Sequence, residues 1–202
     1  MIIGAGGHGR VVADIAIALG IYREIAFLDD GAFAKGFPYS VLGTSDNARE
    51  FIPDWNFVVA IGNQAVRKGL VERLQAYGAV LPALIHPKAV LGSRIQVGEG
   101  TVIMAGTVIN CDSTIGCGCI INTGATLDHD NHLGDFVHIC PGTHLAGSVR
   151  IGAKSWIGVG STVRNNCSIA EDCLIGAGAV VCGDILEPGT YIGIPARKMT
   201  EK

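Results

Sequence analysis

An aliphatic residue recurs at every sixth position from residue 85 onward, without a single slip. The seventeen positions are Ile85, Leu91, Val97, Ile103, Ile109, Ile115, Ile121, Leu127, Leu133, Ile139, Leu145, Ile151, Ile157, Val163, Ile169, Ile175 and Val181. An α-helix repeats every 3.6 residues and a β-strand every two, so neither produces this pattern. A solenoid with three short sides per coil does. Eighteen residues would then form one coil, with the aliphatic side chains pointing inward.

A second column of residues follows each aliphatic position by four, from Thr101 to Ala179. It holds only Thr, Ser, Cys, Ala and Val, with Asn131 as the one exception. Small side chains of this kind fit near the corners of a narrow prism, and glycines fit turns where no side chain has room. Three cysteines, Cys119, Cys167 and Cys173, belong to this column, where cysteine behaves as a compact apolar residue. We therefore predict a parallel β-helix without a catalytic thiol.

Residues 1–82 follow a different pattern, in which short apolar runs alternate with helical spacing. It predicts strands over 1–3, 25–28 and 57–61 and helices over 10–19 and 64–77, with Gly78 as a C-cap. Such alternation is typical of a parallel α/β sheet. We expect two domains, an α/β domain over 1–82 and a β-helix over 83–202.

Composition excludes several classes of protein. The net charge is −3, so nothing favours binding to nucleic acid or to an anionic membrane surface. No apolar stretch reaches the roughly 18 residues that a membrane span needs. The chain opens on a glycine loop without a basic or apolar leader, so we expect no signal peptide. Its seven cysteines form no CxxC pair, which fits a reducing cytoplasm.

Several motifs, taken in order, resemble those of bacterial sugar acetyltransferases with hexapeptide repeats. They are Gly4–Gly9, Phe27–Asp30, Ala60–Asn63, Leu84–Pro87, Asn122–Gly124, Asp128–Asp130 and Gly193–Arg197. The sequence is similar to UDP-4-amino-sugar N-acetyltransferases of the PglD type and to sialic acid O-acetyltransferases of the NeuD type. The resemblance implies a Rossmann-like nucleotide-sugar domain, a left-handed β-helix, a homotrimer, and acetyl-CoA bound between neighbouring coils.

The loop Gly4-x-Gly6-x-x-Gly9 lets the backbone approach a diphosphate at a helix N-terminus. A domain of only 82 residues, with His8 inside the loop, argues against a dinucleotide. The resemblance implies that the nucleotide sugar is held by Gly7, His8, Gly9, Asp29, Asp30, Gly62 and Asn63. The alternative is a glycine turn that only packs a helix against a strand.

Four of the six histidines lie between residues 129 and 144, a density that invites a metal interpretation. His132, His138 and His144 each precede an inward aliphatic residue, so each would lie on a different side of one coil. Side chains that diverge in this way cannot converge on one ion within a chain. We predict no metal site.

His129 differs from the others because Asp128 and Asp130 flank it. A neutral imidazole can accept a proton near neutral pH, and a carboxylate beside it would orient the ring. The resemblance matches His129 to the catalytic base and Asp130 to its partner, although the PglD type has Glu there. Asp128 and Asp112, the latter nearly one coil earlier, are competing partners. The alternative is a surface histidine in a polar turn.

Coil arithmetic predicts a site between subunits. His129 and His138 are half a coil apart, whereas Asn122 and His138 are nearly a full coil apart and would share an edge. We therefore expect His129 of one chain to face Asn122 and His138 of its neighbour in a trimer. The resemblance implies that Asn122 contacts the sugar and His138 the acetyl end of CoA. It also implies that Val159 and Ala177 line the pantetheine groove, and we expect an oxyanion donor near Gly147.

The expected reaction is direct transfer of acetyl from acetyl-CoA to the amine of a UDP- or GDP-linked 4-amino-4,6-dideoxy sugar. O-acetylation of sialic acid is the alternative enzyme function, because it needs the same base and the same groove. A non-catalytic scaffold or sugar sensor on the same fold is a third hypothesis. Such a protein would be expected to lose His129 or its acidic neighbours.

Overall fold

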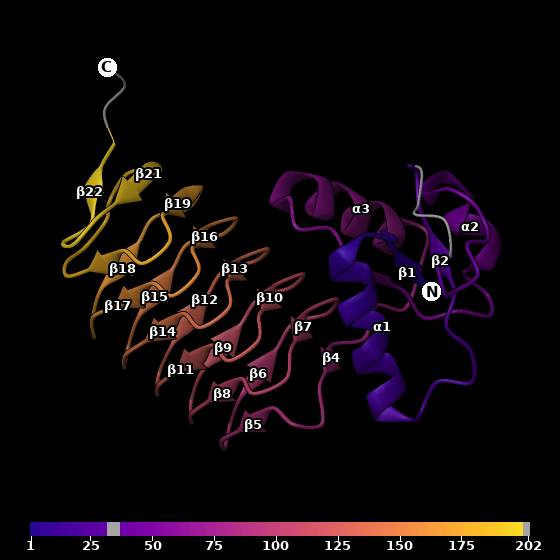
Figure 1. Cartoon of the computed structure of the whole chain (residues 1–202), viewed down its shortest axis with the longest axis horizontal. Helices are drawn as coiled ribbons and strands as arrows, with labels where there is room; N and C mark the ends of the chain where they lie inside the picture. The colour runs from indigo at the N-terminus through magenta and orange to yellow at the C-terminus, as the bar shows by residue number, and fades with distance from the viewer. Residues whose placement is uncertain (32–36, 200–202) are drawn as a thin grey trace.

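The computed structural model describes residues 1–31 and 37–199, which form two parts lying end to end (Figure 1). The N-terminal part contains a parallel three-stranded sheet in the order β2-β1-β3. Its strands are β1 (Ile2–Ile3), β2 (Phe27–Leu28) and β3 (Val58–Val59), and its helices are α1 (Gly7–Leu19), η1 (Ser45–Asn47), α2 (Ala48–Phe51) and α3 (Gln64–Ala76). The strand and helix order agrees with the predicted α/β alternation.

Helix α1 begins at Gly7, three residues before the predicted start, so His8 and Gly9 are helical. The glycine loop permits this early start. Gly4 has φ +108°, and a Cβ on Gly9 would lie 1.9 Å from the Gly4 carbonyl oxygen. Only glycine allows the helix to approach the end of β1 this closely. Gly20, with φ 65°, ends the helix by donating its N–H to the Ile17 carbonyl.

The C-terminal part is a β-helix of three sheets, parallel except where the last strand of the first sheet pairs antiparallel with its neighbour, and most of its strands have two residues. The first sheet contains β4 (Leu84–Ile85), β7 (Val102–Ile103), β10 (Ile120–Ile121), β13 (His138–Ile139), β16 (Trp156–Ile157), β19 (Cys173–Ile175), β21 (Gly189–Ile192) and β22 (Arg197–Lys198). The second contains β5 (Val90–Leu91), β8 (Val108–Ile109), β11 (Thr126–Leu127), β14 (His144–Leu145), β17 (Thr162–Val163) and β20 (Val180–Val181). The third contains β6 (Gln96–Val97), β9 (Thr114–Ile115), β12 (His132–Leu133), β15 (Arg150–Ile151) and β18 (Ser168–Ile169).

The six-residue period of the sequence corresponds to the step from one strand of a coil to the next, so that each strand forms one of the three sides. Ile103, Ile121 and Ile139 pair in register from coil to coil, and their side chains lie in one continuous core. Every residue of the small column is buried as well. Hydroxyls in that column form hydrogen bonds between successive coils. Ser155 Oγ, for example, donates to the Ala170 carbonyl and accepts from the Cys173 N–H. The predicted coil of eighteen residues is confirmed by this register.

Three corners with positive φ separate the sheets, and each has its own composition. The polar corner, between the second and third sheets, consists of Arg94, Asp112, Asp130, Ser148 and Asn166. The mixed corner, between the third and first sheets, consists of Gly100, Gly118, Phe136, Lys154 and Asp172. The glycine corner, between the first and second sheets, consists of Gly106, Gly124, Gly142, Gly160 and Gly178.

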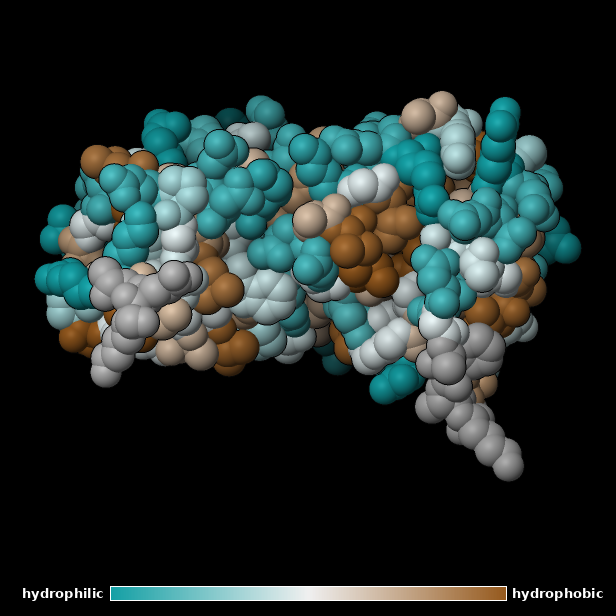
Figure 2. Space-filling model, turned by 90° about the horizontal axis from the view of Figure 1, so that it is seen from above, coloured by the Kyte–Doolittle hydropathy of each residue, from teal (hydrophilic) through white to brown (hydrophobic). Residues whose placement is uncertain are grey.

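The two parts share buried surface. Leu84, Val102 and Ile120 on the outer side of the first sheet pack in one cluster with Ile2 and Val12 of the N-terminal part. Figure 2 shows the molecule narrowing where the parts meet, with a hydrophobic area beside the narrowing. None of the helices within 1–31 and 37–199 is long and apolar enough to cross a bilayer.

Candidate active site

His129 lies in the polar corner, on the turn that leads from β11 to β12. The next residue, Asp130, has φ 58°, a left-handed conformation that Asp tolerates better than most residues do. In this geometry His129 Nδ1 is 2.7 Å from Asp130 Oδ2. The ring is half-exposed. The turn therefore presents an imidazole outward, with a carboxylate on its inner nitrogen.

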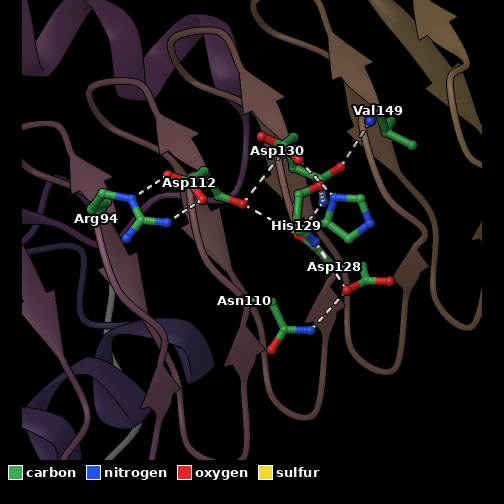
Figure 3. A network of polar contacts seen from close by, with 9 residues as sticks. Arg94, Asn110, Asp112, Asp128, His129, Asp130 and Val149 are labelled. Atoms are coloured by element: carbon green, nitrogen blue, oxygen red, sulfur yellow. Dashed lines mark hydrogen bonds and ion pairs between the residues drawn. The ribbon is translucent and has the colours of Figure 1, made fainter.

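The two other candidate carboxylates are occupied elsewhere (Figure 3). Asp128 accepts hydrogen bonds from Asn110 Nδ2 at 2.8 Å and from the His129 backbone N–H at 3.0 Å. Asp112 forms a two-point ion pair with Arg94, with N–O distances of 2.6 and 2.7 Å. These contacts lower the pKa of both carboxyl groups. Of the three carboxylates that the sequence left open, Asp130 is the one in contact with the ring.

The hydrogen bond to Asp130 raises the pKa of His129, and the nearby charges of Asp128, Asp130 and Asp112 act in the same direction. An ionised carboxylate accepts only, so Nδ1 carries the hydrogen and Nε2 keeps the lone pair. Nε2 has no hydrogen-bond partner within the described part of the chain. The ring is thus set up to accept a proton from a bound molecule.

Gly147, one coil after His129, lies directly beneath the imidazole. A Cβ there would be 2.6 Å from both Cε1 and Nε2 of His129. Its own N–H donates to no acceptor within residues 1–31 and 37–199. The glycine therefore provides both the space for the ring and an uncommitted backbone donor beside it.

Gly147→Ala should lower kcat by about 100-fold, because the new methyl group displaces the imidazole while the backbone, whose φ is not positive, accommodates alanine. The unfolding temperature should change little, since the displaced group is a half-exposed side chain. The control is Gly183→Ala, where a Cβ meets nothing within 4 Å. A Gly147→Ala enzyme with wild-type kcat would show that the ring position seen here is not the reactive one.

The carboxylates predicted to bind nucleotide sugar organise the N-terminal part itself. Asp29 Oδ2 accepts the Ala5 N–H at 2.5 Å, which fixes the glycine loop. Asp30 accepts from the backbone N–H and the hydroxyl of Ser45 at 2.6 and 2.7 Å. Their direct contact with a substrate remains a prediction.

The second predicted loop, around Gly62 and Asn63, precedes helix α3. Asn63 caps this helix, accepting the Val66 N–H at 3.0 Å. Arg67, on the first turn of α3, donates to the Ile61 and Gly62 carbonyls and also to the Gly118 and Phe136 carbonyls of the mixed corner. It is 1% exposed, and burial lowers its pKa to about 10. Arg67 thus fixes the loop to the β-helix.

Asn122 and His138 share an edge, as coil arithmetic predicted, with Asn122 Nδ2 3.3 Å from His138 Nε2. The Asn122 amide oxygen accepts the Thr123 N–H at 2.8 Å, so its nitrogen faces the histidine. His138 is 6% exposed, and its ring lies tilted against that of Trp156, with 4.3 Å between ring centroids. Its Nδ1 has no partner in the described residues. Burial lowers its pKa to about 3 and that of His8 to about 4. Both rings are therefore neutral near pH 7.

Comparison with known proteins shows which family the chain belongs to. Residues 1–74 match the PglD N-terminal domain family, and residues 148–183 match the bacterial transferase hexapeptide family. The acetyltransferase domain of PglB from Neisseria gonorrhoeae, solved with acetyl coenzyme A, is 43% identical with a TM-score of 0.94. That match covers 98% of this chain and 97% of the other. The chain belongs to the PglD-type family of hexapeptide-repeat sugar acetyltransferases.

Two further relatives of this PglD-type chain carry substrate names. PerB from Caulobacter crescentus, solved with CoA and GDP-perosamine, is 37% identical over 98% of this chain and 96% of that one, with a TM-score of 0.92. A UDP-N-acetylbacillosamine N-acetyltransferase of Bacillus subtilis is 39% identical over 112 residues, 52% of this chain. The match spans half the length of that enzyme. The predicted fold class, a Rossmann-like domain followed by a left-handed parallel β-helix, is confirmed.

The remaining predicted residues of the PglD-type chain lie apart from His129. Val159 and Ala177 are exposed and stand one coil apart, each just before a residue of the glycine corner. His132, His138 and His144 belong to three different sheets, as predicted. Within the described ranges, no three His, Cys, Asp or Glu side chains gather as a metal site would require. Burial raises the pKa of the Cys119 thiol to about 12, which keeps it protonated.

Sequence reasoning missed Arg67 and Trp156. Arg67 occupies a helical run in which any arginine looks like a solvated surface residue. Trp156 stands at an outward position of its strand. The sequence does not show that Arg67 reaches the mixed corner or that Trp156 lies against His138. Neither role could therefore be predicted from the residue type alone.

Proposed function

We propose that this chain transfers the acetyl group of acetyl-CoA to the amino group of a nucleotide-linked 4-amino-4,6-dideoxy sugar. The observation that carries the proposal is the His129–Asp130 pair, whose unpartnered Nε2 lies next to the backbone of Gly147, a residue whose N–H also has no acceptor among the described residues. It stands in a chain similar over its whole length to a protein solved with acetyl coenzyme A and to one solved with GDP-perosamine.

In the proposed reaction, the sugar nitrogen attacks the thioester carbonyl while His129 Nε2 takes a proton from that nitrogen. Asp130 stabilises the imidazolium that forms and holds the ring in the required tautomer. The Gly147 N–H would stabilise the oxyanion of the tetrahedral intermediate. When the C–S bond breaks, the amide forms and the CoA thiolate leaves, taking up the proton that His129 releases.

We propose that His8, Gly9 and the loop at Gly62 and Asn63 border the nucleotide sugar, and that Asn122 contacts the sugar ring. His138, Val159 and Ala177 would border acetyl-CoA. The residues of the β-helix among them lie on or beside the first sheet and the glycine corner, whereas His129 is on the polar corner. These are Asn122, His138, Val159 and Ala177. A site that uses both sets is complete only when a second chain supplies one of them. We therefore propose a homotrimer, which light scattering should show as a mass of three chains. We also propose a cytoplasmic location, which the seven free thiols favour.

The test is loss of acetyl-CoA with a panel of acceptors: UDP- and GDP-linked 4-amino sugars, free sialic acid and CMP-sialic acid. Thioester absorbance should be followed directly, because the accessible cysteines Cys111, Cys117 and Cys182 would react with a thiol reagent. Turnover with a 4-amino nucleotide sugar supports the proposal. One relative above is named for UDP-N-acetylbacillosamine and another was solved with GDP-perosamine, and no contact in the structure favours the O-acetyltransferase alternative. Turnover with sialic acid alone would establish that alternative.

Replacing Asp130 with Asn should shift the acid limb of the kcat–pH profile to lower pH. Asp130 raises the pKa of His129, so losing the charge lowers that pKa, and the neutral base persists at lower pH. The maximal rate should fall about tenfold, because the imidazolium loses its counter-charge. Asn tolerates the positive φ at this position, so the turn itself is preserved. An acid limb that stays in place would mean that another group titrates.

A further inference from the structure

Asn131 is the residue of the small column that sequence patterning could not explain. Its neighbours in the column, one coil before and one coil after, are Ser113 and Val149. Asn131 is fully buried, and a buried amide is costly unless its donors and acceptor are paired. It is also two residues from His129. The hydrogen bonds of its side chain therefore bear on how His129 is held.

Three hydroxyls of the column, on Thr101, Ser113 and Ser155, accept the N–H eighteen residues ahead and donate to the carbonyl fifteen residues ahead. The other hydroxyls of the column only donate. Ser113 does both, accepting from the Asn131 N–H and donating to the Asp128 carbonyl, each at 3.2 Å. Asn131 keeps the accepting half of this pattern, since its Oδ1 receives the Val149 N–H at 3.1 Å. Its donating half is different.

The Asn131 amide nitrogen turns back to its own coil. Nδ2 is 2.5 Å from the Asp128 carbonyl oxygen and 3.5 Å from the His129 carbonyl oxygen. The opposite orientation of the amide would set Oδ1 against two carbonyl oxygens and Nδ2 against an N–H, so the contacts fix the orientation. The column residue beside the candidate base thus holds the turn on which that base is mounted.

His129 depends on such backbone restraints because its side chain is half-exposed and bonds only to Asp130 among the described residues. Its carbonyl accepts the Ser148 N–H at 2.9 Å, and its N–H donates to Asp128 Oδ1. At the peptide between Asp128 and His129, Asn131 adds a second and shorter bond to the Asp128 carbonyl, which Ser113 Oγ also contacts at 3.2 Å. We propose that Asn131 is a positioning residue, whose buried amide clamps the Asp128–Asp130 turn and thereby holds His129 and its carboxylate partner in register. This inference rests on the proposed role of His129 as the base.

Asn131→Ser is the informative variant, because serine is a normal residue of this column. By analogy with Ser155, it should still accept the Val149 N–H and donate to the carbonyl of Ala146, so the coil stays stitched. Only the backward bonds from Asn131 Nδ2 to the Asp128 and His129 carbonyls are lost. Ser155→Ala is the matched control, since it removes a column hydroxyl from a corner far from His129.

The first measurement needs no substrate. In the folded wild-type chain, the ring nitrogens of His129, followed by ¹⁵N NMR, should show a single tautomer with hydrogen on Nδ1. Asn131→Ser should show a mixture of tautomers, and Ser155→Ala should show the wild-type pattern. Identical ring signals in Asn131→Ser and the wild type would overturn the proposal, whatever substrate the enzyme uses.

The second measurement is kinetic. Asn131→Ser should lower kcat about tenfold and change KM for acetyl-CoA and acceptor by less than about twofold, because the turn positions the base and not the substrates. In a His129→Ala background the same exchange should leave the residual rate unchanged. An equal loss in both backgrounds would contradict a role exerted through His129. A wild-type chain without turnover on any acceptor would count against the proposed function, while the NMR result would still decide the role of Asn131.

Discussion

His129→Ala should lower kcat about 1,000-fold, the middle of the range for loss of a general base. Nε2 of this ring has no hydrogen-bond partner among the described residues, whereas the neighbouring carboxylates of Asp112 and Asp128 are bonded to Arg94 and Asn110. Binding of acetyl-CoA, measured by calorimetry, should stay within about threefold of the wild-type value. The half-exposed ring adds little to the core, so the fold should persist.

The matched control for this variant is His132→Ala. His132 is three residues further along the same coil, exposed on the outer side of the third sheet. Its loss should leave kcat unchanged. If the two alanine variants had similar kcat values, a different group would have to take the proton, and the polar corner would not be the reactive one.

Arg67→Met should lower the free energy of unfolding by roughly 3 kcal/mol or more. The guanidinium bonds to four backbone carbonyls at 2.7–2.8 Å, two in the β3–α3 loop and two in the mixed corner. Methionine fills the space but donates nothing, and each buried acceptor left unpaired costs about 1–3 kcal/mol. Thermal unfolding should occur about 10 °C lower.

Arg73 provides the control on the same helix. It pairs with Asp46 at 2.8 Å and with the Ser45 hydroxyl, in a partly exposed position. Arg73→Met should cost less than about 1 kcal/mol, as is usual for an exposed ion pair. Equal unfolding temperatures for the two variants would show that Arg67 does not join the two parts of the chain. Weaker binding of a nucleotide sugar to Arg67→Met would extend its role to the Gly62–Asn63 loop.

The β-helix could be predicted in detail because its period is dictated locally. Each inward aliphatic residue from Ile85 to Val181 reports on one side of one coil, so the pattern fixes coil length and register at once. The prediction of element boundaries in the α/β part was less precise. Helix α1 starts inside the glycine motif, at Gly7, because the close approach of Gly9 to Gly4 makes the loop shorter than its sequence suggests.

The choice among carboxylates could not be made from the sequence. Asp128, Asp130 and Asp112 are the same residue type, and each lies beside His129 either along the chain or nearly one coil away. What separates them is the prior engagement of Asp112 by Arg94, one coil earlier, and of Asp128 by Asn110. The roles of Arg67 and Asn131 could not be predicted either. Both side chains bond to backbone carbonyls, whose positions a sequence does not show.

The most direct test of the central claim is the product formed from acetyl-CoA and a nucleotide-linked 4-amino sugar. Mass spectrometry should show a gain of one acetyl group on the nucleotide sugar, and hydroxylamine should not remove it, because an amide resists the reagent whereas an ester does not. The same incubation with His129→Ala should leave the sugar almost unmodified. An unmodified sugar in the wild-type reaction, or an acetyl group that hydroxylamine releases, would contradict acetyl transfer to the amine.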